Sequence, residues 1–387
     1  MGFFSHPQSR SDETSFPPIE RLDGEPVFRM FVLGTRGSGK TVFLASLYNQ
    51  LKTQSDARNN FRVEASDEQR DLLIEKYDAV RNVDRDWPPG DVDATDYEFR
   101  CIHTAKRAEL PIFQFRYADY PGGSVTKRKT VDNFTVLPMI RQSHTILVLI
   151  DGLVVLKKLK NAHDGSSLDE ELDKVLDIVQ QCIRRPLQFV LTKHDLLADY
   201  SLKQIRDVLF QNEGFSNIIS LRRKLNIPTQ LIPVSAVGAN FAEWDMAREK
   251  MKKRPGAVAR PYNIDLTLCF TITDALMSRF GQNEWPQALK ARLATGGSAI
   301  VSALSILSGF AGYGAVLLDD VWLMRAVTLL QATTSAWREK THGMSELIGA
   351  RARDITDKNS AINAVMEIQH LLREDFAARN PESNLLA

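Results

Sequence analysis

Apolar runs and amphipathic stretches alternate along this chain from about residue 26 to residue 280. Mostly apolar runs, which suit strands buried in a sheet, occur at 28–33, 145–150, 187–191 and 230–234. Residues 97–102 and 111–117 alternate between apolar and polar positions, which predicts two strands paired as a hairpin. Helical spacing of apolar residues occurs at 42–48, 66–80, 167–183 and 202–225, the last with an interruption near Gly214. Strands that alternate with helices predict an α/β fold, with a doubly wound, mostly parallel sheet and helices on both faces.

The pattern changes after Phe241. The run 248–254 is rich in charge and precedes Pro255, which predicts a surface helix, with a contact to anionic lipid or to a partner as the alternative. Residues 264–280 are apolar enough to form the helix that closes the sheet. Farther on, one face of a predicted helix, expected to pack in a core, carries Ile362, Val365, Met366, Leu372 and Phe376. The tail after Asn380 is expected to fray.

An uncharged segment lies between these two helices. Residues 293–318 contain no charged side chain and have about the length that a bilayer-spanning helix requires. Apolar residues continue at 321–327, beyond Asp319 and Asp320. Two interpretations therefore stay open for 293–330. It is either a buried or oligomerising helical hairpin, or a membrane segment oriented with the part of the chain that precedes it in the cytoplasm.

Composition and charge narrow the class of protein. The chain is 43% hydrophobic and 25% charged, as in a globular protein, and its net charge of +1 argues against a nucleic-acid partner. Its three cysteines lie far apart without metal-ligand spacing, so a reducing, cytoplasmic location fits. The N-terminus lacks the basic start and apolar run of a secretion signal, and residues 1–25 are expected to form a flexible tail.

A glycine-rich stretch joins the first predicted strand to the first predicted helix. It reads Gly34-Thr35-Arg36-Gly37-Ser38-Gly39-Lys40-Thr41, which matches G-x-x-x-x-G-K-[ST]. Its glycines allow successive backbone N–H groups to face one concavity, and the helix start adds the positive end of its dipole. Lys40 would reach the terminal phosphates of a nucleotide, and the Thr41 hydroxyl would hold Mg²⁺. The stretch is therefore predicted to be a phosphate-binding loop.

Polar residues also stand at the ends of three later strands, in Asp119-Tyr120-Pro121-Gly122, Thr192-Lys193-His194-Asp195 and Ser235-Ala236. The first is a D-x-x-G, in which Asp119 would hold a ligand of Mg²⁺ and the Gly122 backbone N–H would meet the γ-phosphate. Because such sheets bind ligands at the carboxyl ends of their strands, we expect these turns to lie close to the phosphate-binding loop.

Four motifs in this order, each at the end of a strand, resemble the G domain of the TRAFAC class of P-loop GTPases, to which Ras-like G domains belong. Within that class the nearest group is the bacterial TRAFAC-clade GTPases of uncharacterised or multi-component systems. The resemblance implies a G domain over 26–285 that binds GTP or GDP with Mg²⁺, followed by a helical C-terminal region over 286–387.

The resemblance also implies how the base is held. The Asp195 carboxylate would accept two hydrogen bonds from guanine, from N1–H and the 2-amino group, a donor pair that adenine lacks. Lys193 would lay its alkyl stem over the base, and Ala236, next to Ser235, would offer its backbone N–H to the guanine oxygen. Thr192 stands where the commoner pattern has Asn, a variant that is expected to weaken nucleotide affinity.

Two further positions bear on catalysis. A threonine that closes over Mg²⁺ is expected between the first helix and the predicted hairpin, and Thr95 is our choice, with Thr104 as the alternative. After D-x-x-G, many GTPases have a Gln that orients the attacking water, but this chain has Gly123. We therefore expect slow hydrolysis, or a catalytic group supplied by Arg36, by the basic run 127–129, by a protein partner or by a second copy of the chain.

Three functions remain open on the sequence alone. The first is a GTP-hydrolysing switch, in which the loops around Thr95 and Asp119 report the bound nucleotide to the C-terminal region. The second is a nucleotide-holding scaffold or assembly subunit with negligible turnover, which agrees with Gly123. The third is an ATPase, which would contradict the role of Asp195.

Overall fold

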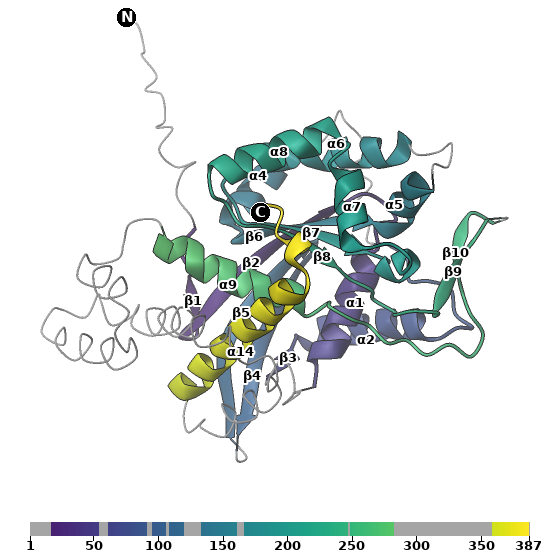
Figure 1. The fold of residues 1–387 in the computed structure, drawn as a ribbon. Helices are drawn as coiled ribbons and strands as arrows, with labels where there is room; N and C mark the ends of the chain where they lie inside the picture. The colour runs from purple at the N-terminus through teal and green to yellow at the C-terminus, as the bar shows by residue number, and fades with distance from the viewer. Residues whose placement is uncertain are drawn as a thin grey trace, which may run out of the picture.

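The computed structural model describes residues 17–53, 61–90, 95–105, 108–119, 133–160, 166–246, 248–281 and 358–386 (Figure 1). Within these ranges the chain forms an α/β fold around one mixed, mostly parallel sheet. Its strands are β1 (Arg21–Leu22), β2 (Glu25–Gly34), β3 (Arg62–Glu64), β4 (Thr95–Ala105), β5 (Ala108–Asp119), β6 (Thr145–Asp151), β7 (Leu187–Thr192) and β8 (Thr229–Pro233). Their order is β3-β4-β5-β2-β6-β7-β8, with β1 beside β2.

The apolar runs predicted as buried strands do lie in the sheet, where β2, β6 and β7 are central and β8 is the last strand. Strands β5, β2, β6, β7 and β8 pair in parallel. Every residue of β6 and β7 is buried, as expected for strands covered on both faces. The predicted hairpin is the antiparallel pair β4–β5, which β3 extends on its other side. The hairpin reaches Thr95 and Asp119, so its open end lies next to the carboxyl end of β2.

Helices cover both faces of the sheet, which confirms the layered arrangement that the sequence predicted. They are α1 (Lys40–Leu51), α2 (Asp67–Arg81), α4 (Asn133–Gln142), α5 (Gly152–Leu159), α6 (Ser166–Gln180), α7 (Leu202–Leu209), α8 (Glu213–Lys224), α9 (Leu266–Gly281) and α14 (Lys358–Arg379). Side chains of β2 alternate between the two layers. Phe28, Met30 and Val32 pack in a core with α1, α9 and α14. Phe31 and Leu33 pack with α4 to α8 on the opposite face.

The start of α2 is fixed by local hydrogen bonds and then tied to the sheet. Ser66 Oγ caps the helix by accepting a bond from the Gln69 backbone N–H, at 3.4 Å. The Gln69 side chain turns toward β4. There its amide donates to the Asp96 carbonyl (3.1 Å) and its Oε1 accepts from the Glu98 N–H (3.2 Å). Helix α2 therefore holds the first residues of β4, directly after Thr95.

The charged run 248–254 is a strand and turn, and the predicted surface helix is wrong. Strand β9 (Ala242–Asp245) pairs antiparallel with β10 (Lys250–Lys253) in a separate hairpin, which lies beside α1 and α2 (Figure 1). The reason is that buried and exposed side chains alternate along β10, a pattern that the charges of its residues do not reveal. Lys250 and Lys252 are exposed, whereas Lys253 is only 7% exposed and is held by carbonyl oxygens. A lysine can thus occupy an inward position when the backbone supplies its acceptors.

The C-terminal helix packs on the sheet, as its apolar face predicted. Helix α14 lies against α9 and β5, and its Val365, Leu372 and Phe376 belong to the same buried core as α1. Both helices cross one face of the sheet in Figure 1. The side chains of Ile362 and Met366 lie outside what the structure describes.

The tail after Asn380 does not fray, which corrects the sequence expectation. A short 3₁₀ helix (Pro381–Ser383) follows α14, and Leu385 is 1% exposed. Asn384 forms a bridge with Gln230 on β8, so the tail covers the edge of the sheet. The burial of Leu385 and these backbone hydrogen bonds explain why this tail packs on the sheet, although polar residues precede Leu385.

The uncharged segment 293–318 and the apolar residues 321–327 lie outside the described residues. In the part of the chain that the structure does describe, no helix combines the length and apolarity needed to cross a membrane.

Candidate functional site

The glycine-rich stretch forms the turn between β2 and α1, as its motif predicted. Gly37 and Gly39 adopt positive φ angles of 92° and 87°, a conformation that favours glycine. A Cβ atom on Gly34 would lie 2.5 Å from Ser38 Oγ and 3.1 Å from the Leu149 carbonyl oxygen. The loop therefore needs glycine both for its curvature and for close contact with β6. Because glycines have no side chain, many of the polar groups of the loop are backbone N–H and carbonyl groups.

Lys40 and Thr41 begin α1 at the mouth of this loop. Lys40 is 9% exposed, and its Nζ donates to the carbonyl oxygens of Gly34 (2.8 Å) and Thr35 (3.4 Å). Thr41 is 8% exposed, and Arg36 is the exposed side chain of the loop. An ammonium at a helix start opposes the helix dipole, whereas an anion bound there would be favoured by both charges. The arrangement thus suits a phosphate group.

The β4–β5 ladder brings together two residues predicted to serve the metal. Thr95 lies directly opposite Asp119, and Asp119 pairs with Val32 near the end of β2. Asp119 is 2% exposed. Hydroxyl and carboxylate oxygens are the ligands that Mg²⁺ prefers, so this pair, with Thr41, could hold the ion. Thr104 lies at the far end of β4, where its hydroxyl accepts a bond from Arg62 (2.7 Å), so the structure does not support this alternative.

The end of β7 is bonded directly to the phosphate-binding loop. The Thr192 hydroxyl lies 2.8 Å from the Ser38 carbonyl oxygen and 3.1 Å from that of Ile150, and it can donate to one of them at a time. Lys193 has a positive φ of 51°, and its Nζ donates to the Gly37 carbonyl oxygen at 3.0 Å. The Thr192-to-Asp195 turn and the loop are therefore one connected unit.

Asp195 is held by the next strand end. Ser235 Oγ donates to Asp195 Oδ1 at 2.5 Å and accepts from the Gly238 N–H at 2.8 Å. Burial raises the pKa of Asp195, and the bond from Ser235 opposes that shift. The Ala236 carbonyl oxygen accepts a bond from Ser46 of α1 (3.1 Å), which fixes the last of the predicted turns against the helix of the loop.

Two acidic residues near the loop were missed by the sequence reasoning. Asp151 ends β6, caps α5 by accepting a bond from Leu153 N–H (2.9 Å), and pairs with Lys193 at 2.6 Å. Burial, and then the nearby Asp151 charge, raise the pKa of Glu171 on α6 to about 7. Asp151 was detectable, because it follows an apolar strand in the same way as Asp119 does. Glu171 was not, because only tertiary packing brings α6 close to Asp151.

The structure therefore brings together most of the predicted site residues. The loop from Gly34 to Thr41, the Thr192–Asp195 turn and Ser235–Ala236 are linked by the hydrogen bonds given above, and Thr95 and Asp119 by strand register. Gly122, Gly123 and the basic run 127–129 lie outside the described residues.

Comparison of the sequence with models of known protein families gives one match. The model of the family described as Double-GTPase 2 matches residues 31–222. No curated protein matches the sequence.

Two solved structures are similar at low identity. One is the signal recognition particle receptor SRb-GTP/SRX complex from Chaetomium thermophilum, at 13% identity and a TM-score of 0.35, covering 55% of this chain and 91% of that chain. The other is the G domain of the T. maritima FeoB iron transporter, at 13% identity and a TM-score of 0.25, covering 54% and 87% respectively.

Proposed function

Residues 31–222 form a Double-GTPase 2 domain, and on this premise we propose that the chain binds GTP with Mg²⁺, hydrolyses it to GDP and acts as a nucleotide-dependent switch. The observation that carries the proposal is the direct bonding of two motifs. Thr192 and Lys193 both bond to backbone carbonyls of the phosphate-binding loop. Groups for the base and for the phosphates are thereby held at a fixed spacing, as one nucleotide requires.

The phosphate end of the site would be served by the loop and the two metal-side residues. Backbone N–H groups of Gly37 and its neighbours face the phosphates, and Lys40 exchanges its carbonyl partners for phosphate oxygens. Thr41 and Thr95 supply hydroxyl ligands to Mg²⁺, and Asp119 holds the ion directly or through a water. The Mg²⁺ ion would neutralise charge on the β- and γ-phosphates.

The base end would select guanine. The Asp195 carboxylate accepts from N1–H and the 2-amino group, Lys193 lies along the base, and Ala236 N–H donates to the guanine oxygen. The bond from Ser235 leaves Asp195 with a second oxygen for the base and orients the carboxylate. A buried carboxylate left without donors is costly, so adenine is rejected.

Hydrolysis would need a group that the chain lacks after D-x-x-G. Gly123 has no side chain with which to orient water, so slow intrinsic turnover is expected. Arg36 is exposed at the loop, where it is available to a bound phosphate or to a protein partner or second copy. The same Gly123 favours a second candidate function, a nucleotide-holding scaffold with negligible turnover.

The proposal keeps a G domain over 26–285 and a C-terminal region over 286–387. It adds one feature, since the last described helix, α14, packs back on the G-domain sheet. Any signal between the two parts would have a direct physical route through α9 and α14.

The test is binding and turnover of guanine nucleotides by the full chain. Lys40→Ala should reduce affinity for fluorescent GTP by about 100-fold or more, because it removes a phosphate ligand from a buried site. Asp195→Asn should lower GTP affinity and raise affinity for xanthosine triphosphate, whose 2-oxygen accepts from the new amide. ATP that displaces GTP from the wild-type chain at equal concentration would overturn the guanine assignment.

Phosphate release separates the switch from the scaffold. Saturable, multiple-turnover release that Lys40→Ala abolishes supports a GTPase, and binding without release supports the scaffold. Arg36→Ala tests whether Arg36 supplies the cationic group for hydrolysis. Unchanged turnover in Arg36→Ala would exclude that side chain.

A further inference from the structure

The two turns that would hold the base are joined to a third segment of the chain. One turn follows β7 and carries Asp195, and the other follows β8 and carries Ser235 and Ala236. We call them the base turns. Reading guanine takes groups from both turns at once, so a residue that fixes their spacing bears on which base is bound.

Tyr262 contacts the second base turn through its backbone. Its N–H donates to the Ser235 carbonyl oxygen at 3.0 Å, and the Ser235 N–H donates to the Tyr262 carbonyl oxygen at 3.3 Å. The next side chain, Asn263, donates to the Pro233 carbonyl oxygen at 3.0 Å. Backbone pairing thus holds the residue whose Oγ donates to Asp195.

The chain between Ser235 and Tyr262 closes on itself next to this pairing. The Arg260 N–H donates to the Val237 carbonyl oxygen at 2.7 Å. Gly238 has a φ of 83°, and a Cβ atom on it would lie 2.3 Å from the Arg260 carbonyl oxygen. Glycine is therefore required here by both its conformation and its close contact. These contacts bring Tyr262 back to the turn from which the segment departs.

The Tyr262 side chain contacts the first base turn. Its hydroxyl shares a 2.9 Å hydrogen bond with His194 Nδ1, and the two rings meet edge to face with centroids 6.0 Å apart. Burial lowers the pKa of His194 to about 4, and burial together with the nearby Asp195 charge raises the pKa of Tyr262. Both groups are therefore neutral at neutral pH, and their bond is one between uncharged partners.

Tyr262 thus bonds to a direct neighbour of each group that would read the base. His194 precedes Asp195, and Ser235 precedes Ala236. The turns are also bonded to each other, because Ser235 Oγ donates to Asp195 and the His194 N–H donates to the Val234 carbonyl oxygen at 3.1 Å. Tyr262 closes these bonds into a ring around Asp195. A shift of one turn against the other must then strain several bonds of one network.

We infer that Tyr262 is a positioning residue that sets the spacing of the two base turns and thereby strengthens the preference for guanine. This inference rests on the proposed function, in which Asp195 accepts from N1–H and the 2-amino group and Ala236 N–H donates to the guanine oxygen. A purine without the 2-amino group loses one of these contacts. The loss is large only when the carboxylate is held where that group would be.

The test compares Tyr262→Phe with Tyr200→Phe in the full chain. Tyr200 follows the first base turn and is half-buried against the core on the α4 to α8 face, so it controls for loss of a tyrosine hydroxyl. Affinities for GTP and for inosine triphosphate, which lacks the 2-amino group, are measured by displacement of a fluorescent guanine nucleotide with Mg²⁺. Tyr262→Phe should weaken GTP binding about fivefold and inosine triphosphate binding less than twofold, because one hydrogen bond that restrains Asp195 is lost.

Tyr200→Phe should leave both affinities unchanged. A purely structural role of Tyr262 would lower stability without changing the ratio of the two affinities. An unchanged ratio in Tyr262→Phe, whether both affinities fall together or neither falls, overturns the inference.

His194→Phe tests the same bond from its other side, and it takes the place of Tyr262→Phe if that variant fails to fold. It keeps an aromatic ring beside Tyr262 and should lower the ratio by a similar factor. In the double variant the second substitution should lower the ratio little further, since both remove one bond. Full additivity of the two single variants overturns the inference. Absence of Lys40-dependent binding in the wild-type chain would instead overturn the proposed function, and this inference with it.

Discussion

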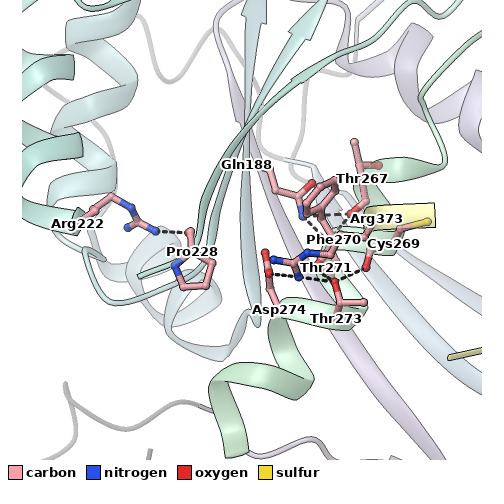
Figure 2. Close-up of polar contacts among 10 residues, drawn as sticks. All are labelled: Gln188, Arg222, Pro228, Thr267, Cys269, Phe270, Thr271, Thr273, Asp274 and Arg373. Carbon is pink, nitrogen blue, oxygen red and sulfur yellow. Dashed lines mark hydrogen bonds and ion pairs between the residues drawn. The ribbon is translucent and has the colours of Figure 1, made fainter. Parts of the chain in front are cut away.

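The two edges of the parallel sheet both hold buried cations on backbone carbonyls, and they use them differently. At the carboxyl edge, Lys40 donates to Gly34 and Thr35 beside the exposed residues of a loop. At the amino edge, Arg222 is 0% exposed and lies where β7 and β8 begin (Figure 2). The first cation lies beside the exposed loop residues Arg36 and Gly37, and the second is enclosed.

Arg222 is bound on every side by its own chain. Its Nε donates to the Thr229 hydroxyl (2.7 Å), and its two terminal nitrogens donate to the carbonyl oxygens of Ile183 (2.7 Å), Arg185 (2.5 Å) and Pro228 (3.1 Å). Burial lowers the pKa of Arg222 to about 9, which leaves it charged at neutral pH. Carbonyl partners alone therefore do not mark a binding site. What distinguishes Lys40 is that its partners belong to a loop whose next residues, Arg36 and Gly37, are exposed.

The largest expected effect on stability comes from removing the enclosed cation, Arg222. Arg222→Met should lower the free energy of unfolding by about 4 to 5 kcal/mol, because it removes four hydrogen bonds that a buried guanidinium donates. Chemical denaturation measures the loss. Lys224→Met, on an exposed position of the same helix, is the control and should change stability by less than about 0.5 kcal/mol. Equal stability of the two variants would refute an enclosed structural role for Arg222.

The second prediction concerns the buried pair in Figure 2, at the contact of α9 and α14. Arg373 Nη1 donates to Asp274 Oδ1 (2.5 Å) and to the Thr273 hydroxyl (2.6 Å), and Asp274 is 0% exposed. Arg373→Met should cost about 3 kcal/mol, because the carboxylate loses its counter-charge. The double variant with Asp274→Asn should cost less than the sum of the two single variants.

The control for this pair is Arg379→Met. Arg379 lies on the same helix in an ion pair with Asp375, but its side chain is 68% exposed. Its removal should cost less than about 0.5 kcal/mol by the same denaturation measurement. Strict additivity of Arg373→Met and Asp274→Asn would show that their contact contributes nothing to stability.

The third prediction moves to the carboxyl edge and depends on pH. The folded-state pKa of Glu171 is about 7 and its ordinary value is 4.5, so the folded chain holds this proton more tightly than the unfolded chain. The resulting stability is present below pH 4.5 and is lost as pH rises through 7. Glu171→Gln should therefore gain roughly 1 to 3 kcal/mol over wild type at about pH 8, and much less at about pH 5.

Thermal or chemical unfolding at the two pH values provides the measurement. Glu170→Gln is the matched control, since Glu170 is the preceding residue and its side chain is 69% exposed. A difference between Glu171→Gln and wild type that is the same at both pH values would contradict the assigned burial effect.

The smallest expected effect comes from Thr192. Thr192→Val keeps the shape of the side chain and removes the hydroxyl that bonds to Ser38 or Ile150. We expect a loss of about 1 kcal/mol and a several-fold weaker affinity for GTP, because the turn loosens from the phosphate-binding loop. Thr192→Ser, which restores the hydroxyl, should recover the affinity. If Thr192→Val binds GTP as wild type does, the hydroxyl does not join the two motifs functionally.

Local signals predicted the carboxyl edge well. The loop, Thr95, Asp119 and the turn at Asp195 each follow or begin a strand, and parallel strands gather their ends at one edge. The amino edge carried no such signal. Arg222 is one of three consecutive basic residues on a polar helix, and only the folded chain shows which of them points inward.

The sequence did not predict the β9–β10 hairpin for a similar reason. Its charged residues suggested a solvated helix, but the carbonyls that accept from Lys253 come from residues 79–85, far away in sequence. The tail was mispredicted because Leu385 is buried against elements that precede it by more than a hundred positions in the chain. Sequence periodicity reports which residues of one helix or strand share a face. It contains no information on contacts between residues that are far apart in the sequence, such as these.

The position of α14 has a consequence for how the protein is made. The buried core that contains Phe43 and Phe115 also contains Val365 and Phe376, so it stays incomplete until ribosomes have translated nearly to residue 380. During synthesis the phosphate-binding loop therefore emerges long before the helix that completes its supporting layer. A nascent chain stopped before α14 would expose apolar side chains of α9 and β5, a surface that chaperones recognise.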